Sequence, residues 1–436
     1  MKQYLYFENE KAIALSDHPF LNENNFITLD SVPEGPLSLY KVRKGKLMKG
    51  DQIPLESLRV AVISNWGINC GIATYTKYLC NQLRVLVGDL RIFAEDAAPE
   101  YCLNDKNDQV TRCWDRSGEY QSIYKHVAEY DPDIIFVQHE FGLFHKANLF
   151  CSMMSQLSKW RTVVTLHTVL EHDVDNLEAR LDYMTRSLSE AACREVIVHS
   201  PRARGTLRDR GFSGRVHFIP HGCLPPANLK RLPATKYGMF PKHSIFQYGF
   251  GGAHKGWESA IEVVDRLVKK YPDVFYVGIF NVSSSDERAN AYHEKLLKIV
   301  RDKSLEKHVA ILKGYQSEVM LSNFLRSVKA CLFLYQVPHS YWASWGASGA
   351  IQQPLSLGVP MVLSRYPAFL EMEGKLPLCS NIDEAVELID RIFSDEQFEH
   401  EMLKKSIALS EDRSWDRIAA WYLDCSANED YNAKCL

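Results

Sequence analysis

From Leu58 onward, the chain alternates between short apolar segments typical of β-strands and longer segments with helical periodicity. The strand-like segments of the first half are LRVAVIS, DLRIFAE, DIIFVQ, TVVTL, EVIVHS and VHFIP. Strands that alternate with helices along a chain form a parallel sheet with helices packed on both faces. This pattern therefore predicts a Rossmann-like lobe, which we assign to residues 58–228.

A second alternating set begins at Ser244 with SIFQYGF and continues with VFYVGIF, VAILKG, ACLFLY and PMVLS. It predicts a second Rossmann-like lobe over residues 229–410, so the fold class is α/β with two doubly wound lobes facing a cleft. Between Gly222 and Lys242 the sequence contains four prolines and no regular apolar period, which is typical of a linker. The apolar spacing in SWDRIAAWYLDCS predicts a terminal helix, within a segment assigned to residues 411–436.

Residues 1–57 have a different pattern, in which short strand-like pieces are separated by Asn, Pro and Gly, and they predict a small β-rich appendage. The 436 residues, 46% of them apolar and 24% charged, are enough for two large globular lobes. No apolar run approaches the roughly 20 residues that span a bilayer. Nor do the first twenty residues have the basic and apolar regions of a signal peptide. We therefore expect a cytoplasmic protein.

The eleven cysteines include no C-x-x-C pair, so neither a zinc knuckle nor a disulfide framework is expected. A net charge of -3 disfavours a polyanion-binding surface over the whole chain, but two local basic clusters remain. Each is either a solvated face or a contact site for a polyanion or for the inner face of a membrane. The first comprises Lys41, Arg43, Lys44, Lys46 and Lys49, and the second Arg202, Arg204, Arg208, Arg210 and Arg215.

The stretch Ser244–Leu267 combines an apolar strand, a glycine-rich turn, a lysine and an amphipathic helix. Glycines including Gly252 allow the backbone to turn tightly, and the free N–H groups of the following helix attract phosphate. Lys255 adds a full positive charge at the helix start, where it would disfavour the helix but favour a bound diphosphate. A tight turn with a solvated lysine is the alternative.

In such lobes ligands bind at the carboxyl ends of the strands, so the loops that follow strands are the places to look. SNWGINCGIATYT supplies Gly67, Asn69 and Gly71, although it lacks the G-x-G-x-x-G pattern of dinucleotide binding. Several histidines on adjacent loops indicate a shared cleft, and a metal site is the rival interpretation. These polar residues are Gln138, His139, Glu140, His145, His167, Glu171, His172, Asp173 and His221.

In the second lobe, WASWGASGAIQQPLSLGVP places small residues at the start of a short helix. The free amides of Ser348, Gly349 and Ala350 would face the same cleft. Gln353, one turn further on, has an amide that can hydrogen-bond a sugar hydroxyl.

Taken together, CGIATYT, QHEFGLF, TLHTV, IPHG, HKGWE, SGAI and LSLGVPMVLS resemble the motifs of the family-4 retaining glycosyltransferases of the GT-B fold. The resemblance covers most of residues 58–423. It implies that the second lobe binds a nucleotide-sugar, that the first lobe binds the acceptor, and that the terminal helix crosses back to the first lobe.

Carried over by position, the resemblance implies catalytic roles for Lys255, which would hold the donor diphosphate, and for His167, which would stand near the reacting sugar. On the donor side it implies Gly67, Gly71, Gly252, Lys255, Tyr315, Ser348, Gly349, Ala350 and Gln353. On the acceptor side we expect Asn69, His139, Glu140, His172 and His221.

The sequence departs from the family pattern at two places. The arginine that commonly precedes the lysine falls on Gly249, and the usual E-x7-E glutamates fall on Trp345 and Gln353. Trp345 cannot replace a carboxylate that contacts the donor sugar, so the identity of the donor stays open.

These observations predict a hexosyl- or pentosyltransferase that uses a nucleotide-sugar as co-substrate, with retention and without a cofactor or an obligatory metal. The expected acceptor is a glycan or a lipid-linked glycan, and modified DNA is an alternative. Two further alternatives remain open, a catalytically silent GT-B scaffold that binds a nucleotide and a metal-dependent hydrolase that uses the histidine loops.

Overall fold

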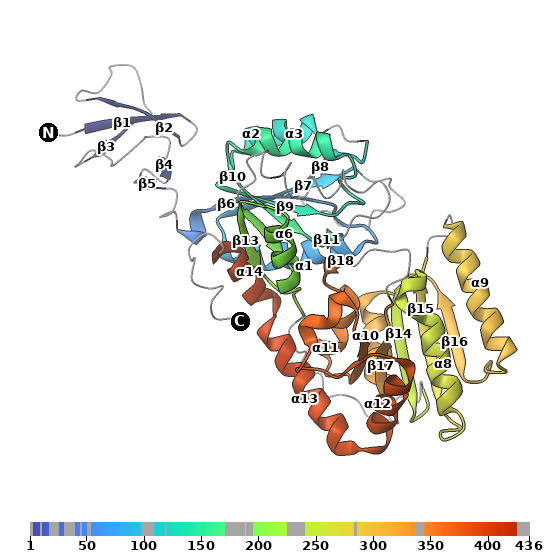
Figure 1. Ribbon diagram of the computed structural model, residues 1–436. Coiled ribbons are helices and arrows are strands. Elements are labelled where there is room, and N and C mark those ends of the chain that lie inside the picture. Colours follow the sequence, from blue (N-terminus) through green and yellow to red (C-terminus); the bar gives the residue numbers. More distant parts are fainter. Residues whose placement is uncertain are drawn as a thin grey trace.

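A computed structural model describes residues 54–96, 109–117, 120–170, 188, 195–224, 240–282, 286–336 and 344–424, together with five strands between residues 3 and 49. Figure 1 shows two large lobes, one above the other, with a separate small sheet at the amino end. The predicted linker and the predicted helix around Leu177–Ala192 fall largely outside the described residues. So does His172. The domain boundaries that we assigned from the sequence stay a prediction.

The first lobe is built on a seven-stranded parallel sheet with the order β13-β12-β10-β9-β6-β7-β8. Its strands follow the apolar segments seen in the sequence. They are β6 (Arg59–Ser64), β7 (Asp89–Glu95), β8 (Val110–Trp114), β9 (Ile134–His139), β10 (Arg161–Leu166), β12 (Glu195–Val198) and β13 (Arg215–Phe218). The central strands β6, β9 and β10 are largely buried on both faces, as a parallel sheet between helix layers requires.

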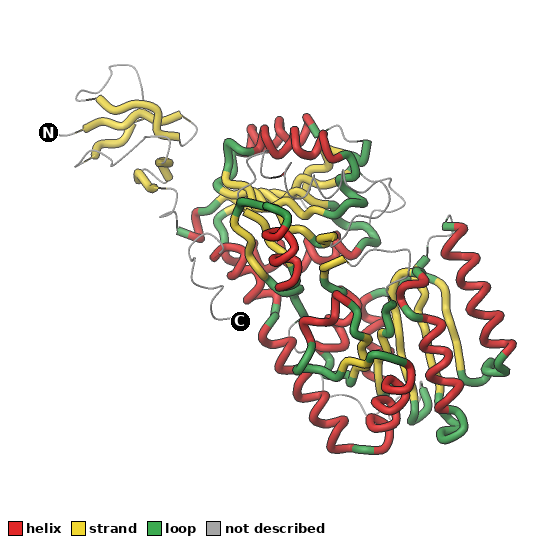
Figure 2. The backbone as a smooth tube through the Cα atoms, in the orientation of Figure 1, coloured by secondary structure: helices red, strands yellow, loops and turns green. Residues whose placement is uncertain are grey.

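Helices cover both faces of this sheet (Figure 2). Side chains of α2 (Gln121–Tyr130), α3 (Ala147–Leu157) and α6 (Pro201–Asp209) form the core on one face. On the other face, α1 (Gly71–Leu86) packs beside α14 (Trp415–Asp424), which comes from the far end of the chain. The last helix therefore belongs to the core of the first lobe.

The second lobe has a six-stranded parallel sheet with the order β16-β15-β14-β17-β19-β20. The strands are β14 (Ser244–Phe250), β15 (Phe275–Asn281), β16 (Val309–Lys313), β17 (Ala330–Phe333), β19 (Met361–Ser364) and β20 (Leu378–Cys379). One face packs against α8 (Trp257–Leu267), α9 (Glu287–Asp302) and α12 (Ile382–Ser394). The other face packs against α10 (Glu318–Ser327), α11 (Gln352–Ser356), the 3-10 helix η8 (Pro367–Met372) and α13 (Glu396–Asp412).

The N-terminal strands form a separate antiparallel sheet with the order β3-β1-β2-β4-β5. They are β1 (Gln3–Glu8), β2 (Lys11–Ser16), β3 (Phe26–Leu29), β4 (Tyr40–Arg43) and β5 (Lys46–Lys49). The predicted β-rich appendage is therefore confirmed as a sheet. Of the first basic cluster, Lys41 and Arg43 fall on β4, and Lys46 and Lys49 fall on β5.

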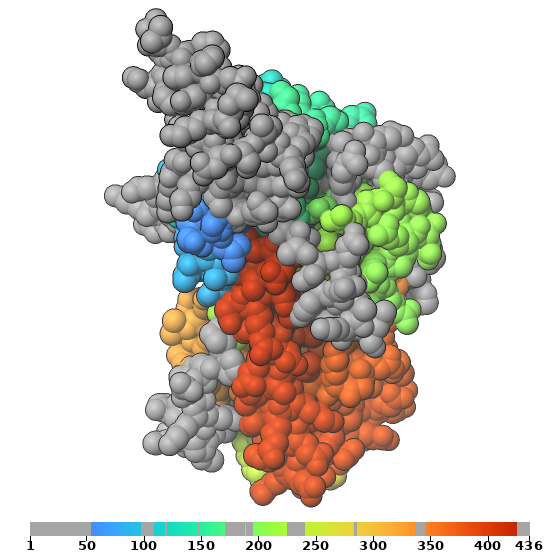
Figure 3. Space-filling model, turned by 90° about the vertical axis from the view of Figure 1, so that its left-hand side faces the viewer, coloured from blue at the N-terminus to red at the C-terminus, as the bar shows by residue number. Residues whose placement is uncertain are grey.

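Among the described residues, two features link the lobes. The ridge formed by α13 and α14 runs along one side of the molecule from the second lobe to the first (Figure 3). At the junction of these helices, the Cys223 amide donates a hydrogen bond of 2.7 Å to the Arg413 carbonyl. The second link is a two-stranded antiparallel sheet, in which β11 (Thr168–Leu170) of the first lobe pairs with β18 (Ser344–Gly346) of the second.

No helix within the described ranges combines the length and the apolar character that a membrane crossing requires.

Candidate active site between the lobes

A pocket of about 330 Å³ lies between the two sheets, and we call it the interlobe pocket. The first lobe lines it with the start of α1 and with the segment that follows β13. The second lobe lines it with residues after β14, β15, β16 and β17 and with the loop that leads into α11. Loops that follow parallel strands therefore form both walls, as expected for a ligand site in facing α/β lobes.

Lys255 reaches this pocket from the turn between β14 and α8. The turn is held by Gln247, whose side-chain amide donates a hydrogen bond of 2.8 Å to the Lys255 carbonyl. The next residue, Gly256, has a φ of 73°, and a Cβ there would lie 1.8 Å from the carbonyl oxygen of Leu334. Only glycine fits this position, so the close packing of the backbone fixes where Lys255 points.

The ammonium of Lys255 lies 4.0 Å from the centre of the Tyr335 ring. Among the described residues, no carboxylate forms an ion pair with it. A cation on an aromatic face, without a carboxylate partner, is available to an incoming anion.

The opposite wall of the second lobe is the loop that contains Ser348, Gly349 and Ala350. Gln352 holds this loop in place, since its amide nitrogen donates to the Ser348 carbonyl at 2.9 Å and its oxygen accepts from the Cys223 thiol at 2.9 Å. Gln353 lines the pocket, and its amide nitrogen donates to Ser322 Oγ at 2.7 Å. The loop is therefore held rigidly by side chains before any ligand binds.

The buried His167 and His199 and the half-buried His221 surround the Tyr75 ring, and we call these three residues the histidine cluster. His167 Nε2 lies 2.9 Å from Gln138 Oε1, while Nδ1 of the other two histidines hydrogen-bonds backbone carbonyls at 2.8 Å. Burial lowers the pKa of His167 well below its usual value, that of His199 to about 4 and that of His221 to about 3. The cluster is therefore neutral at pH 7.

Of the predicted site residues, eight line the interlobe pocket: Gly71, His221, Lys255, Tyr315, Ser348, Gly349, Ala350 and Gln353. Six others are described but do not line it: Gly67, Asn69, His139, Glu140, His167 and Gly252. The structure thus brings together the predicted donor-side residues of the second lobe except Gly252, and only Gly71 and His221 of those predicted in the first lobe.

His139 and Glu140 lie at the end of β9, beneath the pocket wall rather than on it. His139 is fully buried among Phe141, Phe144 and Phe150, and this burial lowers its pKa to about 3. Glu140 accepts a hydrogen bond of 2.8 Å from Thr168 Oγ1, and burial raises its pKa. Both residues therefore support the edge of the first sheet.

Trp345 stands where the family pattern has a glutamate, yet it does not line the pocket. It lies on β18 opposite Val169, with 4% of its surface exposed, and packs into the core of the first lobe. The guanidinium of Arg202 lies 5.4 Å from the centre of its ring. This arginine of the second basic cluster therefore contacts an aromatic ring instead of being fully solvated.

Sequence reasoning missed several aromatic residues of the pocket. Tyr75 and Tyr78 come from the first turns of α1, Tyr335 from the end of β17, and Trp415 from the start of α14. The spacing of Tyr75 and Tyr78 by three residues places them on one side of a helix, which was a usable signal. Trp415 gave no such signal, because its neighbours come from distant parts of the chain.

Of the strand-end histidines that a metal site would have used, those that the structure describes do not converge. His139 is buried in an aromatic core, whereas His145 is exposed on the following loop. Within the part of the chain that the structure describes, no three His, Cys, Asp or Glu side chains are arranged to hold a metal ion.

Residues 70–223 match the family model described as Glycosyltransferase Family 4. The whole architecture resembles sucrose-phosphate synthase from Thermosynechococcus elongatus, with 16% identity, a TM-score of 0.65, and coverage of 84% of this chain and 98% of that one. The predicted likeness to family-4 glycosyltransferases of the GT-B fold is confirmed.

Two further structures show the same GT-B fold. A trehalose-6-phosphate synthase is 13% identical, with a TM-score of 0.64 and coverage of 85% of this chain and 99% of that one. A structure described as trehalose-6-phosphate from E. coli bound with UDP-2-fluoro glucose is 14% identical, with a TM-score of 0.63 and the same coverage. None of the curated proteins matches the chain.

Proposed function

We propose that this GT-B protein transfers a hexosyl or pentosyl group from a nucleotide-sugar in the interlobe pocket to a hydroxyl group of an acceptor. The observation that carries the proposal is Lys255, whose ammonium lines the pocket without a carboxylate partner among the described residues. Charge-assisted hydrogen bonds from such a cation, together with the free amides at the start of α8, favour a diphosphate. The structural neighbour that holds UDP-2-fluoro glucose supports a donor of this class.

We place the rest of the donor along the second lobe. The base and ribose would lie near Tyr315 and Gln353, which line one end of the pocket. Because the amide nitrogen of Gln353 donates to Ser322 Oγ and to the Glu318 carbonyl, its oxygen is the group that can accept a ribose hydroxyl. The transferred sugar would lie against the Ser348–Ala350 loop, whose amides can replace the missing carboxylate as hydrogen-bonding partners.

The chemistry we propose is displacement with retention on one face of the sugar. The acceptor oxygen bonds to the anomeric carbon as the bond to the diphosphate breaks, and the acceptor proton passes to the leaving phosphate oxygen. Glu318 is the only carboxylate among the described residues that line the pocket, and it lies near Tyr78 at the opening. Stabilisation of the leaving group by Lys255 is then the main catalytic contribution of the protein.

His167 does not line the pocket, so we assign it a supporting position behind His221. Because His221 is neutral, it can hydrogen-bond the sugar without repelling Lys255. We keep a glycan or lipid-linked glycan as the proposed acceptor, with modified DNA as the alternative, and we propose that a cofactor or metal is not required.

The test is a calorimetric titration of the full chain with a panel of nucleoside diphosphates and their sugars, with EDTA present throughout. One nucleotide should bind, and Lys255→Ala should weaken it by about tenfold or more, the value of one charge-assisted hydrogen bond. The matched control is Lys269→Ala, an exposed lysine just beyond α8. If no donor bound, or if both variants behaved alike, the assignment of Lys255 would be wrong.

An activity assay of the same variants, with and without EDTA, separates the rivals. A silent scaffold would bind the nucleotide-sugar but would neither hydrolyse nor transfer it. A metal-dependent hydrolase would lose activity in EDTA while tolerating Lys255→Ala.

A further inference from the structure

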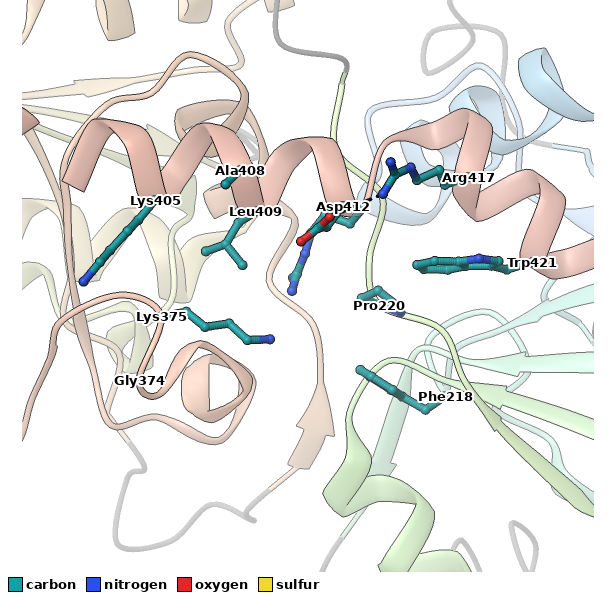
Figure 4. Close-up of a pocket in the computed structure, with 11 residues that line it drawn as sticks. Phe218, Pro220, Gly374, Lys375, Lys405, Ala408, Leu409, Asp412, Arg417 and Trp421 are labelled. Carbon is teal, nitrogen blue, oxygen red and sulfur yellow. Dashed lines mark hydrogen bonds and ion pairs between the residues drawn. The ribbon is translucent and has the colours of Figure 1, made fainter. Parts of the chain in front are cut away.

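A second pocket, of about 620 Å³, lies on the side of the molecule where the chain crosses between the lobes, and we call it the crossover pocket (Figure 4). The first lobe contributes Phe218 and Pro220, which follow β13. The second lobe contributes the turn with Lys375 and the last turns of α13, and α14 completes the wall. Its volume is within the range of roughly 300–1,000 Å³ that is usual for sites of small ligands. It shares no lining residue with the interlobe pocket.

The crossover pocket has an excess of positive charge. Lys375 extends into it from the turn beyond η8, whereas Lys405 lines it from α13 with its ammonium pointing away from Lys375, as Figure 4 shows. Neither lysine has an ion-pair partner within the described ranges. Arg417, by contrast, lies 3.3 Å from Asp412 and is balanced by it. Because α13 ends and α14 begins here, helix dipoles of opposite sign adjoin, so the side chains decide the sign of the potential.

Arg413 adds an observation that independently points to a ligand. It lines the pocket with only 4% of its surface exposed, and it pairs with the buried Glu371 at 3.2 Å. Its Nε is buried and has no hydrogen-bond acceptor within the described part of the chain. A buried donor without an acceptor is unfavourable, and an anion bound at this wall would supply one.

The other end of the pocket is apolar. Figure 4 shows Trp421, Pro220 and Phe218 gathered there, away from the two lysines. Aromatic side chains offer flat faces on which sugar rings or nucleobases can stack. One end therefore suits a phosphate and the other suits a ring.

We propose that the crossover pocket is a second ligand site, which binds a phosphorylated ring compound with its phosphate at the positively charged end beside Lys375 and its ring near Trp421. A sugar phosphate and a nucleoside monophosphate share this chemistry. The site is separate from the donor site, so the inference goes beyond the proposed function and does not depend on it.

The position of this site gives its ligand access to the link between the lobes. Pro220 is followed directly by His221 and Gly222, which line the interlobe pocket. The Arg413 carbonyl accepts the hydrogen bond from Cys223. A ligand here therefore lies beside the segment after β13 and the junction of α13 and α14, which this hydrogen bond joins.

The test uses the full-length chain carrying Lys255→Ala, so that phosphate binding in the interlobe pocket is suppressed. Calorimetric titrations are made with inorganic phosphate, glucose 6-phosphate and uridine monophosphate. At least one of the two organic phosphates should bind about tenfold more tightly than inorganic phosphate, because stacking on Trp421 adds to the charge term. Adding Lys375→Ala and Lys405→Ala should weaken that ligand by about tenfold or more. The matched control is Lys404→Ala, the exposed neighbour on the same helix that does not line the pocket.

Trp421→Leu separates the two ends of the site. It should weaken the organic phosphate while leaving the affinity for inorganic phosphate unchanged. Tighter binding of glucose 6-phosphate would indicate a sugar phosphate, and tighter binding of uridine monophosphate would indicate a nucleoside monophosphate. The proposal is overturned if no probe binds at millimolar concentration, if Lys404→Ala has the same effect as the double substitution, or if inorganic phosphate binds as tightly as both organic probes. Thermal melting of each variant shows that the fold is intact.

Discussion

Trp345 packs a loop of the second lobe against the core of the first, and replacing it should weaken that contact. Its strand, β18, pairs with β11 over only three residues on each side. Three residue pairs give little stability by themselves. The buried indole must therefore supply most of the free energy that holds the two strands together.

The expected size of the effect follows from the burial of the side chain. Removing a buried tryptophan to alanine typically costs about 3–5 kcal/mol. The Nε1 of Trp345, however, is buried without a hydrogen-bond partner among the described residues, which offsets about 1 kcal/mol or more. We therefore expect Trp345→Ala to weaken the local connection by about 2–4 kcal/mol, a factor of about 30 to 1,000 in the opening equilibrium.

Hydrogen exchange read out by mass spectrometry measures this opening at peptides that contain Thr168–Leu170 and Ser344–Gly346. Trp345→Phe is the matched control, since it keeps an aromatic ring while removing the unpaired donor, and it should change exchange by less than about tenfold. Equal protection in the wild type and in Trp345→Ala would refute the reasoning. A loss of protection in Trp345→Phe as large as that in Trp345→Ala would also refute it.

Three further predictions concern the surroundings of the interlobe pocket. The histidine cluster is neutral when folded, but its histidines have pKa values near 6.5 when unfolded. Its contribution to the free energy of unfolding is therefore fully present above about pH 6.5. As the pH falls from there towards 4, stability should decrease by about 1.4 kcal/mol per pH unit for each histidine. Urea titrations at several pH values would measure this decrease. In a His199→Asn variant the free energy of unfolding should change less steeply with pH. Gly256→Ala should unfold the turn that carries Lys255, because its Cβ would lie 1.8 Å from a carbonyl oxygen, and circular dichroism would detect a much lower melting temperature. Cys70 lines the pocket, so a donor should slow its reaction with a maleimide, and an unchanged rate would place the donor elsewhere.

The sequence was sufficient to predict the two sheets and the turn around Lys255, because both depend on local patterns. A strand followed by glycines and an amphipathic helix specifies its own geometry, and Gly256 with its φ of 73° confirms the need for glycine there. The apolar segments predicted β6 and β14 to within one or two residues. Local propensity and tertiary structure agree at these positions.

The structure corrects the placement of residues whose surroundings come from distant parts of the chain. His139 looked like a cleft residue because it ends a strand, but aromatic residues from the next loop and from α3 cover it. Tyr75 lies against His167, His199, His221 and Trp415, and these residues are spread over most of the chain. No local sequence pattern predicts that these side chains pack around one tyrosine.

Trp345 shows why motif spacing alone misplaces a side chain. Spacing puts it on the donor loop, where a glutamate would face the sugar, but successive side chains of a strand point to opposite faces. Pairing with β11 turns Trp345 towards the core of the first lobe. Its neighbour Gly346 approaches His167 so closely that a Cβ would lie 2.6 Å from the His167 carbonyl oxygen. The loop is thus attached to the first lobe beside the histidine cluster. In the proposed function, contacts to the donor sugar would then come from what remains at the pocket surface, including the Ser348–Ala350 amides, Lys255 and His221.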